Sequence, residues 1–168
     1  MSEHNISLMN DAGILHLGDA SIVIAHTEWN DFIVNELLNG CRALLEKYGL
    51  KKIETLQVPG AFELPFACKR YFEATRDTPL APDALIALGC VIRGGTPHFD
   101  YVCKAVTDGI TRLNLELPIP VIFGVLTVDD EKQARNRIGG EQGHKGAEAA
   151  VTALKMIAFN RQLRSLQP

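Results

Sequence analysis

Short apolar runs alternate with amphipathic stretches of helical length along the chain. The run at Ser21–Ala25 is rich in β-branched residues, and similar runs follow at Ile53–Val58, Ala84–Ile92 and Val121–Val128. Apolar runs of this length, bounded by polar segments, are typical of strands buried in a parallel sheet. We therefore predict a strand at each of these four positions.

Helical spacing of apolar residues separates the predicted strands. Apolar residues recur every three or four positions over Ile33–Tyr48, and Gly49 follows where a C-cap glycine belongs. The same spacing predicts helices at Glu63–Ala74 and Phe99–Leu115.

The C-terminal third of the chain has two further helical segments. Asp129 or Asp130 is expected to cap a short helix that ends near Gly139-Gly140, and a last helix is expected from about Gly146. The residues of this last helix expected to face the sheet are Ala150, Val151, Leu154 and Ile157.

The alternation of strands and helices determines the predicted fold class. Parallel strands joined by helices require right-handed crossovers and a sheet covered on both faces. We predict a three-layer α/β/α sandwich, flavodoxin-like, with a four-stranded parallel sheet and flanking helices. Residues 1–18 lack clear periodicity and are predicted to form an arm, whose apolar segment Ile14–Leu17 would need a partner. Residues 19–168 are predicted to form one domain.

Composition narrows the class of function. Of 168 residues, 46% are hydrophobic, and 17 Lys+Arg against 20 Asp+Glu give a net charge of −3, which disfavours nucleic-acid binding. No apolar run is long enough to cross a membrane, and the first residues do not resemble a secretory signal, so a cytoplasmic protein is expected. The four cysteines have neither CxxC nor zinc-ligand spacing and are predicted to be reduced core thiols.

The segments that follow the strands are the places to look for function, because ligands bind at the carboxyl ends of strands in open parallel sheets. After the third strand, Gly94 and Gly95 let backbone N–H groups approach an anion, and Thr96 adds a hydroxyl. His98, in the first turn of the next helix, is within reach of a bound phosphate ester for proton transfer. A phosphate site is one interpretation of this segment; a plain tight turn with a structural histidine is the other.

Three other side chains each have a functional and a structural interpretation. Trp29, the only tryptophan, either stacks on a flat ligand or covers the core. Glu63 either favours a helix dipole or accepts hydrogen bonds from a polyol. Arg137, in a basic and glycine-rich segment, is either solvated surface or a bidentate phosphate ligand.

Five blocks of the sequence together resemble the signature blocks of the 6,7-dimethyl-8-ribityllumazine synthase family. They occur in the family's order and spacing from Ser21 to about Asn160, and the block around His98 is the most specific. The blocks are Trp29–Phe32, Val58–Pro65, Leu88–Tyr101, Pro120–Thr127 and Gly143–Ala150.

The resemblance implies the penultimate step of riboflavin biosynthesis, in which 5-amino-6-ribitylaminouracil condenses with 3,4-dihydroxy-2-butanone 4-phosphate. It implies no cofactor and no metal. The family assembles as pentamers with active sites between neighbouring subunits, and some members build shells from twelve pentamers. Riboflavin synthase is a candidate protein partner.

The resemblance also implies a role for each matching residue. His98 would transfer protons. The residues expected to bind phosphate are Gly95, Thr96 and Arg137. Those expected around the pyrimidine and its ribityl chain are Trp29, Asn30, Ala61, Phe62, Glu63, the backbone of Cys90, Val91 and Ile92, and also Phe123 and Lys145.

The sequence departs from the family's pattern at four positions. Trp29 stands where Phe is frequent, and Pro97 where a small or hydroxyl residue is common. Glu141 stands where a basic residue is often found, and His144 where Asn usually precedes the lysine. Trp29 preserves the aromatic ring, whereas Glu141 and His144 bear on contacts between subunits.

Two other functions are compatible with the fold. One is a non-catalytic flavin- or phosphate-binding module, and the other is a shell protein with a vestigial pocket. Neither would need Trp29, Glu63, His98 and Arg137 together, so the intact set favours an enzyme.

Overall fold

The computed structural model describes residues 17–166. Its elements are β1 (Ser21–Thr27), α1 (Asp31–Lys47), β2 (Lys52–Val58), the 3-10 turn η2 (Ala61–Glu63), α2 (Leu64–Thr75), β3 (Ala84–Ile92), α3 (His98–Glu116), β4 (Val121–Val128), α4 (Glu131–Arg135), β5 (Ile138–Gly140), β6 (Gly143–His144) and α5 (Lys145–Arg164). Within this range, no helix is both long and apolar enough to cross a membrane.

A parallel sheet forms the centre of the fold. In the described chain it has four strands in the order β2-β1-β3-β4, and every neighbouring pair is parallel. The four predicted strands are confirmed, and β3 and β4 have the bounds predicted from their apolar runs. Because the strands are parallel, their carboxyl ends and the turns that follow them lie at one edge of the sheet.

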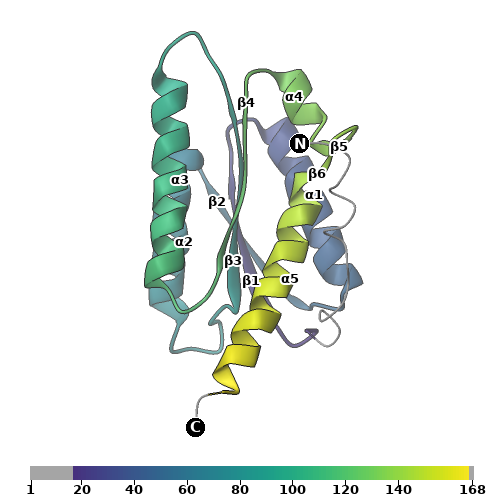
Figure 1. The fold of residues 1–168 in the computed structure, drawn as a ribbon, viewed down its shortest axis with the longest axis vertical. Helices are drawn as coiled ribbons and strands as arrows, with labels where there is room; N and C mark the ends of the chain where they lie inside the picture. Colours follow the sequence, from purple (N-terminus) through teal and green to yellow (C-terminus); the bar gives the residue numbers. More distant parts are fainter. Residues whose placement is uncertain (1–16, 167–168) are drawn as a thin grey trace.

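Helices cover both faces of this sheet (Figure 1). The helices α1 and α5 pack on one face, and α2 and α3 pack on the other. The strand β1 contributes to both cores, because Ile22 and Ile24 face α1 and α5 while Val23 and Ala25 belong to the opposite core. The predicted three-layer sandwich is confirmed.

The segment between β4 and α5 differs from its prediction. Asp130 caps α4 as expected, but the helix ends at Arg135 and not near Gly139-Gly140. The strands β5 and β6 follow and pair antiparallel. Gly139 (φ 108°) and Gly143 (φ 83°) have left-handed backbone conformations that favour glycine and end the helical pattern.

The predicted arm can be judged only at its end. Residues 1–16 lie outside the described part of the chain. Leu17 is 5% exposed and belongs to the core beneath α1 and α5, so its side chain needs no partner from another subunit.

The cysteines are free, as predicted. Cys41, Cys68 and Cys90 are buried, and Cys103 is half-buried. Burial raises the pKa of each of the three buried thiols to about 12. These thiols therefore stay protonated and pack as small apolar groups.

Candidate active site

The strand β3 extends beyond β1 at the carboxyl edge of the sheet. The last residue pair between them is His26 with Leu88, whereas β3 stays paired with β4 as far as Ile92 and Val128. Within the described chain, Gly89–Ile92 therefore have no paired residue in β1. Apart from the Cys90 carbonyl, which accepts a hydrogen bond from the Asn30 side chain, the β1 side of this backbone is available to a ligand.

Asn30 fixes the turn after β1 against this extension of β3. Its Nδ2 donates a hydrogen bond to the carbonyl oxygen of Cys90 at 2.8 Å. Asn30 precedes α1 and has φ 59° and ψ 42°, a left-handed conformation that asparagine tolerates better than most residues. The contribution of Cys90 at this edge is its backbone, because its thiol is buried and protonated.

Trp29 projects from the same turn into solvent. Its side chain is 74% exposed, so it does not cover the core of this chain. Its backbone N–H donates to the carbonyl oxygen of Pro59 at 3.2 Å, which joins the turn after β1 to the turn after β2. The ring is thus free to stack on a ligand beside both turns.

Glu63 lies in the turn after β2. Its Oε2 is 3.2 Å from the point where a Cβ on Gly60 would lie, so the glycine leaves room for the carboxylate. Glu63 has no ion pair or side-chain hydrogen bond with the part of the chain that is described. Phe62 beside it is 61% exposed and Ala61 is buried. The half-buried carboxylate is therefore free to accept hydrogen bonds from hydroxyl groups.

The segment after β3 is open and leads directly into α3. Gly95 and Thr96 are exposed, and His98 is the exposed first residue of the helix. A Cβ on Gly94 or Gly95 would meet nothing within 4 Å, and neither residue has the left-handed backbone that would require glycine. What the glycines provide is therefore open space through which an anion can approach the backbone.

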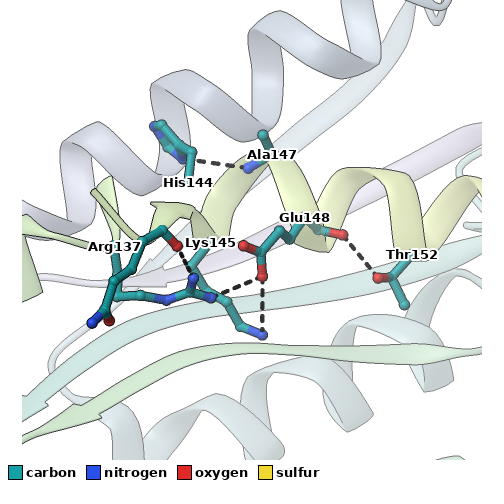
Figure 2. A network of polar contacts seen from close by, with 7 residues as sticks. Arg137, His144, Lys145, Ala147, Glu148 and Thr152 are labelled. Carbon is teal, nitrogen blue, oxygen red and sulfur yellow. Dashed lines mark hydrogen bonds and ion pairs between the residues drawn. The ribbon is translucent and has the colours of Figure 1, made fainter. Parts of the chain in front are cut away.

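Arg137 and Lys145 share one carboxylate on the α5 side of the molecule (Figure 2). Glu148 Oε2 lies 2.9 Å from Arg137 Nη2 and 3.8 Å from Lys145 Nζ. Arg137 also donates to the carbonyl oxygen of Gln142. Its side chain is only 14% exposed, so it is not the solvated surface residue that its basic segment suggested.

Glu148 is the residue of this cluster that sequence reasoning missed. It lies three positions after Lys145 in the first turn of α5, a spacing that places the two side chains on one helix face. That spacing was visible in the sequence, but the approach of Arg137, the residue before β5, was not. Glu148 holds both cations in place and offsets part of their charge.

His144, one of the departures from the family's pattern, packs against α1. A Cβ on Gly40 would lie 2.1 Å from His144 Cε1, so the imidazole occupies space that only a glycine leaves open. Its Nδ1 also accepts a hydrogen bond from the N–H of Ala147 at 3.4 Å and caps α5. His144 thus makes contacts inside the chain, and Glu141 is exposed.

Phe123 does not reach the carboxyl edge. It lies in the first half of β4, pairs with Ala87 and packs beside the core of α2 and α3. Five residues separate it from the end of β4, about 16 Å along a strand. Phe123 therefore cannot contact the same small ligand as His98 of its own chain.

A cavity of about 610 Å³ lies at the opposite end of the sheet. It is lined in part by Asp83 and Ile119, which precede β3 and β4, and by Arg164 near the end of α5. None of the site residues predicted from the sequence lines this cavity. In the described chain the predicted residues instead occupy an open edge, with Trp29 and Phe62 exposed.

A family model and several related sequences point to one family. Residues 19–161 match the family described as 6,7-dimethyl-8-ribityllumazine synthase. A protein of that name from Parabacteroides distasonis is 50% identical over 162 residues, which cover 95% of each chain. Proteins of the same name from Phocaeicola vulgatus and Porphyromonas gingivalis are 42% and 46% identical and cover 98% and 94% of this chain and 96% of their own.

Proposed function

The chain belongs to the 6,7-dimethyl-8-ribityllumazine synthase family, and on that premise we propose how its residues share the reaction. The enzyme condenses 5-amino-6-ribitylaminouracil with 3,4-dihydroxy-2-butanone 4-phosphate to 6,7-dimethyl-8-ribityllumazine and releases phosphate and water. One observation carries the proposed site: Trp29, Glu63 and His98 come from three different βα junctions, and these junctions share one edge of the sheet.

The pyrimidine substrate lies along the turns after β1 and β2. Trp29 stacks on the ring, and the backbone at Cys90, Val91 and Ile92, beyond the last residue pair with β1, binds its polar edge. Asn30 holds the Trp29 turn against β3 through its bond to Cys90. This arrangement orients the substrate amine before the second substrate binds.

The ribityl chain extends toward the turn after β2. The carboxylate of Glu63 is unpaired in the described chain and accepts hydrogen bonds from its hydroxyl groups. Ala61 and Phe62 precede Glu63 in the same turn and supply backbone and apolar contacts to the ribityl chain.

The phosphate ester lies over the segment after β3. The amine attacks the ketone and loses water to give an imine; phosphate then leaves as a proton is removed. The enol that results becomes a carbonyl, and the second nitrogen attacks it and closes the ring with loss of a second water. His98 transfers the protons of these steps. The amides of Gly95 and Thr96 stabilise the charge on the departing phosphate.

A neighbouring subunit completes the site. Phe123 lies down β4, away from the edge that carries His98, and Arg137 and Lys145 lie on the α5 side of the sheet, where both pair with Glu148. We assign them to the site of the adjoining chain, where Arg137 binds phosphate and Phe123 forms a wall. This assignment requires an oligomer. From the family resemblance we propose a pentamer, with twelve pentamers as a further assembly, a cytoplasmic location, and riboflavin synthase as a candidate partner.

Lumazine absorbance tests this function directly. The purified protein, mixed with both substrates, should form lumazine faster than the uncatalysed reaction. His98→Ala should slow turnover by about 10²-fold or less, because the substrate amine is already a good nucleophile. Lys104→Ala, an exposed change on the same helix, is the control and should leave turnover unchanged.

Two results would contradict the proposal. A parent protein no faster than the uncatalysed reaction would overturn the function. Unchanged turnover of the His98→Ala variant at saturating substrate would remove His98 from the mechanism but leave the function intact.

A further inference from the structure

Arg93 is the first residue after β3 and opens the segment that leads to His98. Its backbone N–H donates to the carbonyl oxygen of Val128 at 2.9 Å, which extends the pairing of β3 with β4 by one bond. None of the roles assigned above uses its side chain.

The guanidinium of Arg93 contacts two separate elements. Its Nε lies 2.9 Å from Asp129 Oδ1, just after β4, and its Nη1 lies 3.2 Å from Asp100 Oδ1, in the first turn of α3. Its Cζ also lies 4.0 Å from the centre of the Phe99 ring, a cation–π distance. The hydrogen bond with Asp129 is the main reason why the pKa of Arg93 is raised, so the charge is permanent.

The β4 side of this contact is itself held in place. The backbone N–H of Asp129 donates to Gln133 Oε1 at 3.0 Å, and the N–H of Gln133 donates to Asp130 Oδ1 at 2.8 Å. Asp129 is thus fixed to the start of α4. Arg93 therefore ties the first turn of α3 to a turn that is itself hydrogen-bonded to the start of α4.

The segment between Arg93 and α3 has little else to hold it. Gly94, Gly95 and Thr96 make no hydrogen bond with any described residue. Two adjacent glycines also give this backbone more conformational freedom than other residues would. The path of this segment is therefore set by the residues at its two ends. The Arg93 side chain joins these ends, because it starts at the end of β3 and contacts Phe99 and Asp100 in the first turn of α3.

Arg93 is poorly suited to bind phosphate itself. Its one positive charge faces two carboxylates, Asp100 and Asp129, so the group as a whole is negative. The two carboxylates would repel a phosphate dianion, which would have to displace one of them from Arg93 in order to bind it. The geometry of Arg93 therefore favours holding the loop over binding the ligand.

We propose that Arg93 is a positioning residue that closes the 94–97 loop and thereby sets the place of the phosphate-binding amides and of His98. This inference rests on the proposed function of that loop. Positioned groups convert a bimolecular encounter into an oriented one, and a displacement of about 1 Å can cost about 10²-fold in rate. Removal of the Arg93 side chain should weaken binding of the phosphate substrate. Binding of the pyrimidine substrate should change little, because its contacts come from other turns.

Arg93→Gln is the first variant to measure. With each substrate varied in turn, KM for the dihydroxybutanone phosphate should rise by about tenfold or more, with KM for the pyrimidine substrate within about twofold of the parent. Arg93→Lys keeps the charge but cannot reach both carboxylates with a planar fork, so it should recover only part of the loss. Arg112→Gln, which removes an exposed ion pair at the far end of α3, is the matched control and should match the parent.

Asp129→Asn separates positioning from direct phosphate binding. This variant leaves Arg93 in place and removes a negative charge. If Arg93 positions the loop, KM for the phosphate substrate rises as it does in Arg93→Gln. If Arg93 binds phosphate directly, KM stays the same or falls, and inhibition by inorganic phosphate becomes stronger.

The outcomes distinguish this inference from the function it rests on. A parent protein that forms no lumazine overturns the function. An active parent whose Arg93→Gln variant behaves like Arg112→Gln, or whose Asp129→Asn variant binds phosphate better, overturns the positioning role. If Arg93→Gln does not assemble, Asp129→Asn decides the question alone, with assembly checked by light scattering.

Discussion

Trp29 is the side chain whose role is simplest to measure. It is the only tryptophan in the sequence and is 74% exposed in the described chain. An exposed indole next to the turns after β1 and β2 is either a ligand surface or a contact with another subunit. Its emission reports on both without any added label.

Binding of a ribitylaminouracil analogue should quench Trp29 emission in a saturable way. Trp29→Phe should keep most of the affinity, whereas Trp29→Ala should lose about 0.5–1.5 kcal/mol beyond the loss of buried area. Inhibition by inorganic phosphate should be nearly unchanged in both, because Gly95 and Thr96 follow a different strand. Equal affinity of the parent and Trp29→Ala, or binding without a change in emission, would refute stacking.

His26 links stability to pH. It is 9% exposed, its Nδ1 has no hydrogen-bond partner in the described chain, and burial lowers its pKa below the usual 6.5. The unfolded chain therefore binds a proton at this residue before the folded chain does. The free energy of unfolding should fall as pH decreases through 6.5. The part of this fall that comes from His26 should end once the pH is below the lowered pKa of the folded state.

Urea unfolding at fixed protein concentration measures this effect. The slope due to His26 should approach at most about 1.4 kcal/mol per pH unit and per chain. His26→Leu should remove that part of the slope while leaving the contribution of other groups. An equal slope in parent and variant from about pH 5 to about pH 7, the range in which an unperturbed histidine titrates, would show that His26 is not the group.

The contact between α1 and α5 decides where the second cluster of site residues lies. A Cβ on Gly146 would lie 2.0 Å from the carbonyl oxygen of Leu37, so the two helices meet backbone to backbone. His144 fits over Gly40 one turn along α1. These two glycines allow α5 to begin close to α1, and that placement brings Glu148 to Arg137.

Gly146→Ala tests this contact against helix propensity. Propensity alone predicts that alanine in α5 stabilises the protein by up to about 1 kcal/mol. The clash with Leu37 predicts the opposite sign, a loss of about 1–3 kcal/mol or more. Gly94→Ala, where a Cβ meets nothing within 4 Å, should change the free energy of unfolding by about 0.5 kcal/mol or less. A Gly146→Ala variant as stable as the parent would mean that α5 can move away from α1 at little cost.

The whole molecule presents only part of a site at the edge that carries His98. Trp29 and Phe62 are exposed there, while Phe123 lies about 16 Å further down the sheet and Arg137 is tied to Glu148 on the α5 side. A second chain that brings its own Phe123 and Arg137 to this edge would complete the set. Such an interface is heterologous, and a heterologous interface closes into a ring when the rotation allows it.

Mixed assemblies test whether the sites are shared. Arg137→Ala chains and Glu63→Ala, His98→Ala double-variant chains should each form nearly inactive assemblies. When the two are co-assembled, some interfaces combine an intact His98 edge with an intact Arg137, so part of the activity should return. The mass of the mixed assemblies should show that both chains are present. If such assemblies are as inactive as those built from either variant alone, shared sites are ruled out in this protein.

Local patterns were sufficient to predict the four strands of the central sheet, the helices that cover it and the class of fold. The apolar runs at Ala84–Ile92 and Val121–Val128 became β3 and β4 with the predicted bounds, and Gly49 ends α1 with φ 82°. Strand burial and helical spacing are properties of neighbouring residues, so one sequence reveals them. The rule that ligands bind at strand ends then pointed to His98 without any coordinates.

Only the tertiary structure decided which distant residues meet. The sequence alone did not predict the bond from Asn30 to Cys90, the pairing of Arg137 with Glu148, or the ties of Arg93 to Asp129. It also extended the helix after Asp130 to near Gly139-Gly140, where β5 forms, and predicted neither β5 nor β6, because two short strands held by glycines of positive φ leave almost no periodic pattern. Such contacts depend on strand register and on how closely α5 approaches α1, and these are set by packing across the whole chain and not by any local run of residues.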